Sequence, residues 1–229
     1  MSGPTDGTGL WQKLSKAAEK CSRQPSLKNG QYPVLNLQPS LEYSLSSSFN
    51  DLLFLAILLT GFHGLMQLGE LTWPDKKSLQ DYHKVVMRNS VSFSPKSFQF
   101  LLPGHKADRL FKGDTILIQS TELDNDACAP FAKYITQHDR YFPFRAELWL
   151  KRDGAIPTRF WFLHRLRRHL PGNISGQSLR AGGATALAEA GVPLHMIQPI
   201  GRWSSATFQI YIHRHPVLLA AMLRSSDSC

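Results

Sequence analysis

The chain has 229 residues, of which 42% are hydrophobic, and its 26 lysines and arginines against 17 acidic residues give a formal charge of +9. This length and composition allow one large domain with a proper core, and the basic excess suits a polyanionic partner such as nucleic acid. Three distant cysteines without a CxxC pair argue against a disulfide framework and a zinc site, and the longest apolar run, residues 52–59, is too short to span a bilayer.

Polar, Ser-, Gly-, Pro- and Gln-rich sequence fills residues 1–45, which we interpret as an N-terminal segment or linker with one short helix at 10–21. The remaining residues, 46–229, are expected to form the functional domain. Residues 51–69 are apolar on nearly every face, which predicts a helix buried in a core. Ser47, Ser48 or Asn50 is placed to cap that helix.

Alternating apolar residues follow this helix and predict a small three-stranded antiparallel sheet. Its strands are expected at residues 84–93, 98–102 and 115–118. Helices are then expected at residues 127–138, 159–169, 178–190, 193–200 and 204–214, with a last one beginning at Pro216. This order gives an α+β domain that is mainly helical.

Four segments of the chain stand out by their motifs. The first contains Gln67 and Glu70, the second is the hairpin Leu102-Pro-Gly-His-Lys106, and the third is Gly176-Gln-Ser-Leu-Arg180-Ala-Gly-Gly. The fourth is Gly201-Arg-Trp-Ser-Ser205, followed by Tyr211.

In this order the segments resemble the boxes of the catalytic domain of tyrosine recombinases of the phage-integrase type. The wording of the third and fourth is most similar to fungal mobile-element recombinases of the Crypton type. The resemblance covers roughly residues 50–220 and implies an integrase-like catalytic domain with the small sheet described above.

The resemblance implies DNA breaking and rejoining through a phosphotyrosine, without metal or other cofactor. Tyr211 would be the nucleophile, Arg180 would hold a phosphate oxygen with its planar guanidinium, and Lys106 would protonate the leaving oxygen. The remaining His/Trp position falls on Arg202 by spacing or on Trp203 by residue type, and the sequence leaves this open.

Two positions depart from the family pattern. Gln67 stands where the first box has an arginine, and Gln177 stands where the His-x-x-Arg box has a histidine. Both amides donate hydrogen bonds but carry no charge, so we expect DNA cleavage to be severely weakened or absent. His63, four residues before Gln67 on the expected helix, is a conceivable replacement, whereas Glu70 is expected to be an acceptor within the fold.

Basic residues crowd the helix expected at 159–169. They are Arg159, Arg165, Arg167 and Arg168. We interpret them as candidate DNA-binding residues, with a plain solvated helix face as the alternative.

Three hypotheses therefore stand. The chain is an active recombinase (DNA recombination and integration), a catalytically inactive DNA-binding module derived from a mobile element, or a protein-interaction domain without a DNA role. The first two imply double-stranded DNA as partner, homo-oligomers on that DNA, no membrane association, and an intracellular, nuclear location.

Overall fold

The computed structural model describes residues 48–104, 113–121, 126–169 and 175–203. Its main helices are α3 (Phe49–His63), α4 (Leu68–Leu71), α5 (Cys128–Tyr141), α6 (Arg159–His169), α7 (Ser178–Glu189) and α8 (Leu194–Ile200). Three 3-10 helices are η2 (Lys77–Leu79), η3 (Tyr82–Lys84) and η4 (Arg88–Ser90). The strands are β1 (Ser92–Ser94), β2 (Ser97–Leu102) and β3 (Asp114–Gln119). A mainly helical α+β fold is confirmed.

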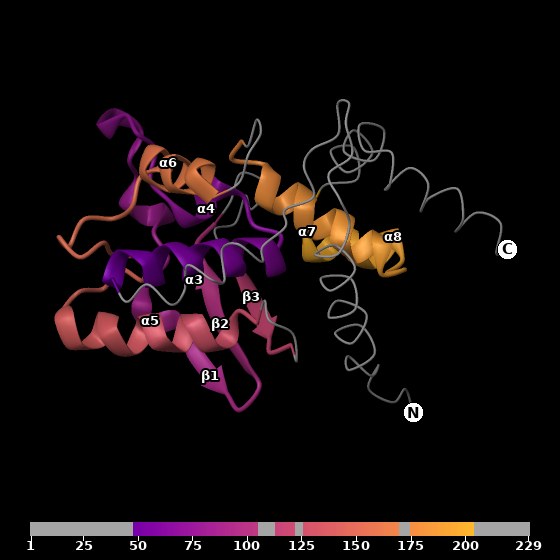
Figure 1. Ribbon diagram of the computed structural model, residues 1–229, viewed down its shortest axis with the longest axis horizontal. Coiled ribbons are helices and arrows are strands. Elements are labelled where there is room, and N and C mark those ends of the chain that lie inside the picture. Colours follow the sequence, from indigo (N-terminus) through magenta and orange to yellow (C-terminus); the bar gives the residue numbers. More distant parts are fainter. Residues whose placement is uncertain (1–47, 105–112, 122–125, 170–174, 204–229) are drawn as a thin grey trace, which may run out of the picture.

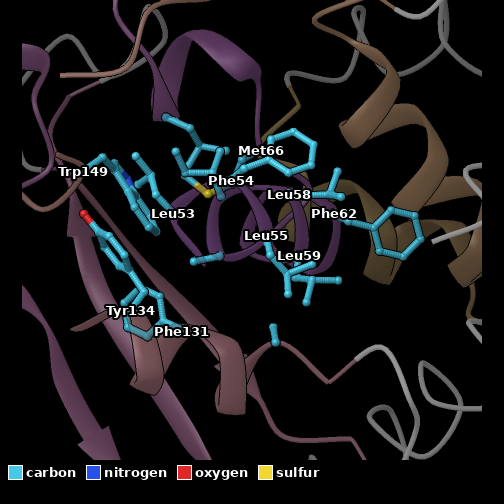
Figure 2. Packing of buried hydrophobic residues seen from close by; sticks show 14 of the residues in the cluster. Leu53, Phe54, Leu55, Leu58, Leu59, Phe62, Met66, Phe131, Tyr134 and Trp149 are labelled. Atoms are coloured by element: carbon cyan, nitrogen blue, oxygen red, sulfur yellow. The ribbon is translucent and has the colours of Figure 1, made fainter. Parts of the chain in front are cut away.

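Helix α3 lies at the centre of the fold, with α5 on one side, α6 on the other and α7 near its C-terminal end (Figure 1). Almost every one of its residues is buried, which explains why its sequence is apolar on all faces. Ser48 caps it, and its hydroxyl accepts a hydrogen bond from the amide of Asp51 at 3.2 Å. Leucines and phenylalanines of α3 pack against Phe131, Tyr134 and Trp149 (Figure 2).

The sheet has the order β1-β2-β3 and is antiparallel throughout, as predicted. Alternate residues Phe98, Phe100 and Leu102 of β2 are buried, and Ile116 and Ile118 of β3 face the same core. The ring of Phe98 stacks on that of Phe131 of α5, with centroids 3.8 Å apart and planes 10° apart, which joins the sheet to the helical layer.

The prediction of a strand over residues 84–93 was wrong except at its end. The neighbouring side chains of Val85 and Val86 are both buried, which a strand cannot do on a single face. Instead η3 ends at Lys84, η4 covers Arg88–Ser90, and between them Val86 accepts at its carbonyl a hydrogen bond from the Leu148 amide at 2.8 Å. Val85 packs in a small cluster with Leu150 and Ile156 and Val86 in the main core, so the segment is buried on two sides and the alternation in the sequence did not indicate a strand.

The prediction of one continuous helix over residues 51–69 was also wrong. Helix α3 ends at His63, and a turn separates it from the four-residue helix α4. Gly64 caps α3, and Leu65 adopts a left-handed backbone with φ of 47°. His63 and Gln67 consequently do not share a helix face, so the proposed replacement of Gln67 by His63 loses its geometric basis.

A second, smaller core lies beside α7 and α8. Its buried members are Leu65, Ala184, Leu187, Ala188, Val192, Leu194, Ile197 and Trp203. The predicted ends of these helices are confirmed to within one residue: α7 stops just before Gly191, whose φ is 78°, and α8 runs from Leu194 to Ile200.

Candidate functional site

The turn between α3 and α4 presents backbone carbonyl groups to the interior. The left-handed conformation of Leu65 turns the chain so that Met66 donates its amide back to Gly61 at 2.8 Å. The amide of Gln67 then donates to Glu70 Oε2 at 2.8 Å, which starts α4. As a result, the Glu70 carboxylate and the carbonyls of residues 64 and 65 are positioned together.

Arg180 reaches this turn from the first turn of α7. Its side chain is 5% exposed, its Nε donates to the Leu65 carbonyl at 2.8 Å, and its Nη2 lies 3.0 and 3.2 Å from the two oxygens of Glu70. The expected role of Glu70 as an acceptor within the fold is confirmed. Arg180 and Glu70 are 110 residues apart in sequence, so this contact exists only in the folded chain.

Close approach of α7 to α3 makes the contact possible. A β-carbon at Gly183 would lie 2.3 Å from the carbonyl oxygen of Phe62 and 2.5 Å from Cδ2 of Leu65. Only glycine fits at that position, and the small residues of α7 thereby bring Arg180 within reach of the turn.

Arg202 approaches the same carboxylate from the end of α8. Its Nη2 donates to Glu70 Oε2 at 3.0 Å and to the Leu65 carbonyl at 3.3 Å, and its Nη1 donates to the Gly64 carbonyl at 3.2 Å. Its backbone is left-handed, with φ of 54°, and its buried Nε has no hydrogen-bond partner within the described part of the chain. Glu70, Arg180 and Arg202 are called the arginine cluster below.

Arg202 and Trp203, the two candidates for the His/Trp position of the fourth segment, both lie at this cluster. Trp203 is 7% exposed and packs in the second core, and the guanidinium of Arg180 lies 5.6 Å from its ring centroid. Arg202 contacts the carboxylate directly, whereas Trp203 supports the neighbouring guanidinium from one side.

Gln67 and Gln177 lie on adjacent turns beside the cluster. The Leu68 amide donates to the Gly176 carbonyl at 3.3 Å, which ties the two glutamine-bearing turns together, and both glutamines are exposed. A β-carbon at Gly176 would lie 2.7 Å from Nη2 of Arg159, so the guanidinium of that exposed arginine lies against the same turn.

This arrangement has the positive charge and the donor groups of a candidate anion site. Two guanidinium groups and one carboxylate carry a formal charge of +1 together, and the side chains are 5%, 10% and 12% exposed. In such a poorly solvated setting electrostatic attraction is stronger than in water. Guanidinium groups bind carboxylate and phosphate through the same planar fork.

The other arginines of α6 divide into two kinds. Arg165 forms an ion pair with Asp51, with Nη1 and Oδ1 2.6 Å apart, and its guanidinium lies 4.8 Å from the ring centroid of Trp161. It therefore joins α6 to the start of α3. Arg167 and Arg168 are exposed on the same helix.

Two predicted catalytic residues, Lys106 and Tyr211, lie outside the described residues, as do the helices expected at 10–21, 204–214 and from 216. Within the described ranges, no group of three or more His, Cys, Asp or Glu side chains is placed to hold a metal ion. Over those ranges, too, no helix is long and apolar enough to cross a membrane.

Sequence reasoning missed the parts of the site that come from the backbone. The carbonyls of Gly64 and Leu65 accept three hydrogen bonds from the two arginines. A pattern of residue types does not reveal these bonds. A left-handed leucine has no signature in sequence, although Gly64, the residue that caps α3, is of a type that often ends helices.

Comparisons with known proteins give weak likeness to solved structures. No protein-family model matches the chain, and no curated protein matches it. One similar solved structure is the XerH site-specific recombinase bound to difH substrate in a pre-cleavage complex, with 13% identity and a TM-score of 0.48 over 92% of this chain. Another is XerH bound to palindromic difH in a post-cleavage complex, with 13% identity and a TM-score of 0.49 over 93%. The chain spans half the length of each.

Proposed function

We propose that this chain is a DNA-binding domain of the tyrosine-recombinase type, which holds a phosphate of duplex DNA at the arginine cluster. The observation that carries the proposal is the convergence of Arg180 and Arg202 on Glu70, beside the exposed Gln67 and Gln177. The recombinase resemblance assigns Arg180, Gln67 and Gln177 to the phosphate site, and Arg202 is one of its two candidates for a further position there. Their meeting in space, from segments more than 100 residues apart, agrees with that assignment.

In this proposal the chain has kept DNA binding and lost DNA cleavage. Tyr211 is the nucleophile and Lys106 the proton donor of the ancestral reaction, but Gln67 and Gln177 supply no positive charge to the transition state. Loss of one preorganised donor lowers a rate on the order of 100- to 1,000-fold. Descent from a mobile element, a nuclear location and assembly of several copies on DNA belong to the same proposal.

Binding to duplex DNA is tested by fluorescence anisotropy over a range of salt concentrations. If about six phosphates are contacted, the log–log slope of affinity against salt is about −5. Absence of binding at low salt would leave only the protein-interaction hypothesis.

The arginine cluster is tested in the same assay with Arg180→Lys, which keeps the charge and loses the fork. Hydrogen bonds to charged groups contribute about 1.5–3 kcal/mol, so affinity should fall about 10-fold or more. Arg88→Lys is the matched control, because Asp139 binds the Arg88 guanidinium at 2.7 and 2.9 Å. Equal affinities of the two variants, both shown to be folded by circular dichroism, would contradict the assignment of the phosphate site.

Cleavage is tested separately with a nicked suicide substrate, in which a covalent protein–DNA band reports attack by Tyr211. The expected result is no band for the native chain and a band for the Gln67→Arg/Gln177→His double variant. A native band that disappears in Tyr211→Phe would show that the site tolerates both glutamines and that the chain is an active enzyme.

A further inference from the structure

One exposed stripe of α6 combines aromatic and basic side chains. Phe160, His164, Arg167 and Arg168 stand at positions i, i+4, i+7 and i+8, so they share one helix face. All four are exposed, and the phenylalanine is 67% exposed. These four residues are called the α6 stripe below.

The opposite face of α6 fixes the orientation of this stripe. Phe162, Leu163 and Leu166 are buried in the main core, and the rings of Phe54 and Phe162 lie 5.1 Å apart. Arg165 is held by Asp51. The helix therefore cannot rotate to bury Phe160 without withdrawing these three apolar side chains from the core.

Phe160 is itself held in place. Its backbone amide donates to Asp75 Oδ1 at 2.7 Å, and its ring lies nearly parallel to that of His164, with centroids 5.8 Å and planes 22° apart. One face of the phenylalanine is thus supported by the imidazole. An aromatic ring fixed in this way is an ordered platform that loses little conformational freedom when a flat group stacks on it.

The charge of the surrounding residues indicates the chemical class of the ligand that would stack on Phe160. Helix α6 contains no acidic residue and ends in Arg167, Arg168 and His169. At its start, the guanidinium of Arg159 lies against Gly176, on the turn beside the arginine cluster. Helix α6 therefore begins beside the proposed phosphate site, and its stripe offers cations beside an aromatic face.

We propose that the α6 stripe binds nucleic acid that presents an unstacked base, with the base stacking on Phe160 and neighbouring phosphates contacting Arg167 and Arg168. Every base has a flat face, so stacking on aromatic residues beside a basic track tolerates any sequence. The inference rests on the proposed DNA-binding function and narrows its substrate to DNA that is gapped or locally opened.

The test compares a fluorescein-labelled continuous duplex with the same duplex carrying a single-stranded gap, by anisotropy at fixed salt. The gapped duplex should bind about 10-fold more tightly, the range expected for one stacked base. Phe160→Ala should abolish this preference and leave the affinity for the continuous duplex nearly unchanged, whereas Phe160→Trp should keep the preference. Leu79→Ala is the control, because Leu79 is similarly exposed at 62% and lies on η2.

The outcomes separate this inference from the function on which it rests. Equal binding of both duplexes, or a preference that survives in Phe160→Ala, overturns the stacking role and leaves duplex binding standing. No binding of either duplex at low salt overturns both proposals. If the stripe instead binds a protein partner, and Phe160→Ala abolishes that binding without changing the affinity for either duplex, the stacking role is also refuted.

Discussion

Replacing Glu70 by glutamine tests whether the arginine cluster holds the two cores together. The carboxylate accepts hydrogen bonds from the Gln67 amide and from both arginines, and its side chain is 12% exposed. The amide of Glu70→Gln keeps the shape, but it removes the negative charge and turns one acceptor into a donor that faces a guanidinium. Breaking a buried ion pair by removing one partner costs about 3–5 kcal/mol, and we expect a value near the lower end because the site is not fully sealed.

The measurement is the free energy of unfolding from urea titration, with the m-value checked for constancy. Asp139→Asn is the matched control: its carboxylate pairs with Arg88, but the side chain is 48% exposed, so the loss should be about 0.2–1 kcal/mol. A double-mutant cycle with Arg202→Met should give a coupling energy of about 1–3 kcal/mol with Glu70→Gln. If Glu70→Gln and Asp139→Asn destabilise equally, or if the coupling is near zero, the reasoning is refuted.

Two further predictions concern packing and acid stability. Gly183→Ala would place its β-carbon 2.3 Å from the Phe62 carbonyl oxygen and should lower the free energy of unfolding by about 1–3 kcal/mol. Gly69→Ala is the control, because there is open space around Gly69 and the change should be neutral or stabilising. If urea titrations give similar effects for the two variants, the close approach of α7 to α3 is contradicted. A side-chain hydrogen bond from Arg145, together with one from Tyr82, holds the pKa of Glu147 at about 2, below the ordinary 4.5. Because the folded-state pKa is lowered, the stabilisation is fully present above pH 4.5 and is lost as pH falls towards 2, so the stability difference between the native chain and Glu147→Gln should shrink over that interval. A difference that stays constant across the acid range would show that the carboxylate contributes nothing through its charge.

Sequence patterns predicted the elements whose burial is one-sided or whose ends carry caps. Ser48 caps α3, Gly191 follows α7, and the alternating residues of β2 and β3 form the predicted hairpin. The pattern failed where a segment is buried on two sides, as at Val85 and Val86, because periodicity then carries no information on the element.

The sequence predicted which residues belong to the candidate site, but it did not predict how they contact one another. Arg180, Arg202 and the two glutamines stand out through the resemblance, and the structure brings them to adjacent turns. Besides Glu70, the two arginines bind the Leu65 and Gly64 carbonyls, whose positions depend on a left-handed turn that tertiary packing imposes on an apolar sequence.

The turn after α3 also divides the interior of the molecule. Leu65 belongs to the second core with α7, α8 and Trp203, whereas Met66 and Leu68 belong to the main core. The arginine cluster therefore lies on the seam between two cores, and it is complete only while they remain in contact. A ligand that binds the assembled cluster selects that closed state and stabilises it in proportion to its concentration and affinity. Occupancy of the site and local opening of the α7–α8 end are thus thermodynamically linked. Tight binding of a polyanion should therefore slow hydrogen exchange at the seam more than it slows exchange in the main core.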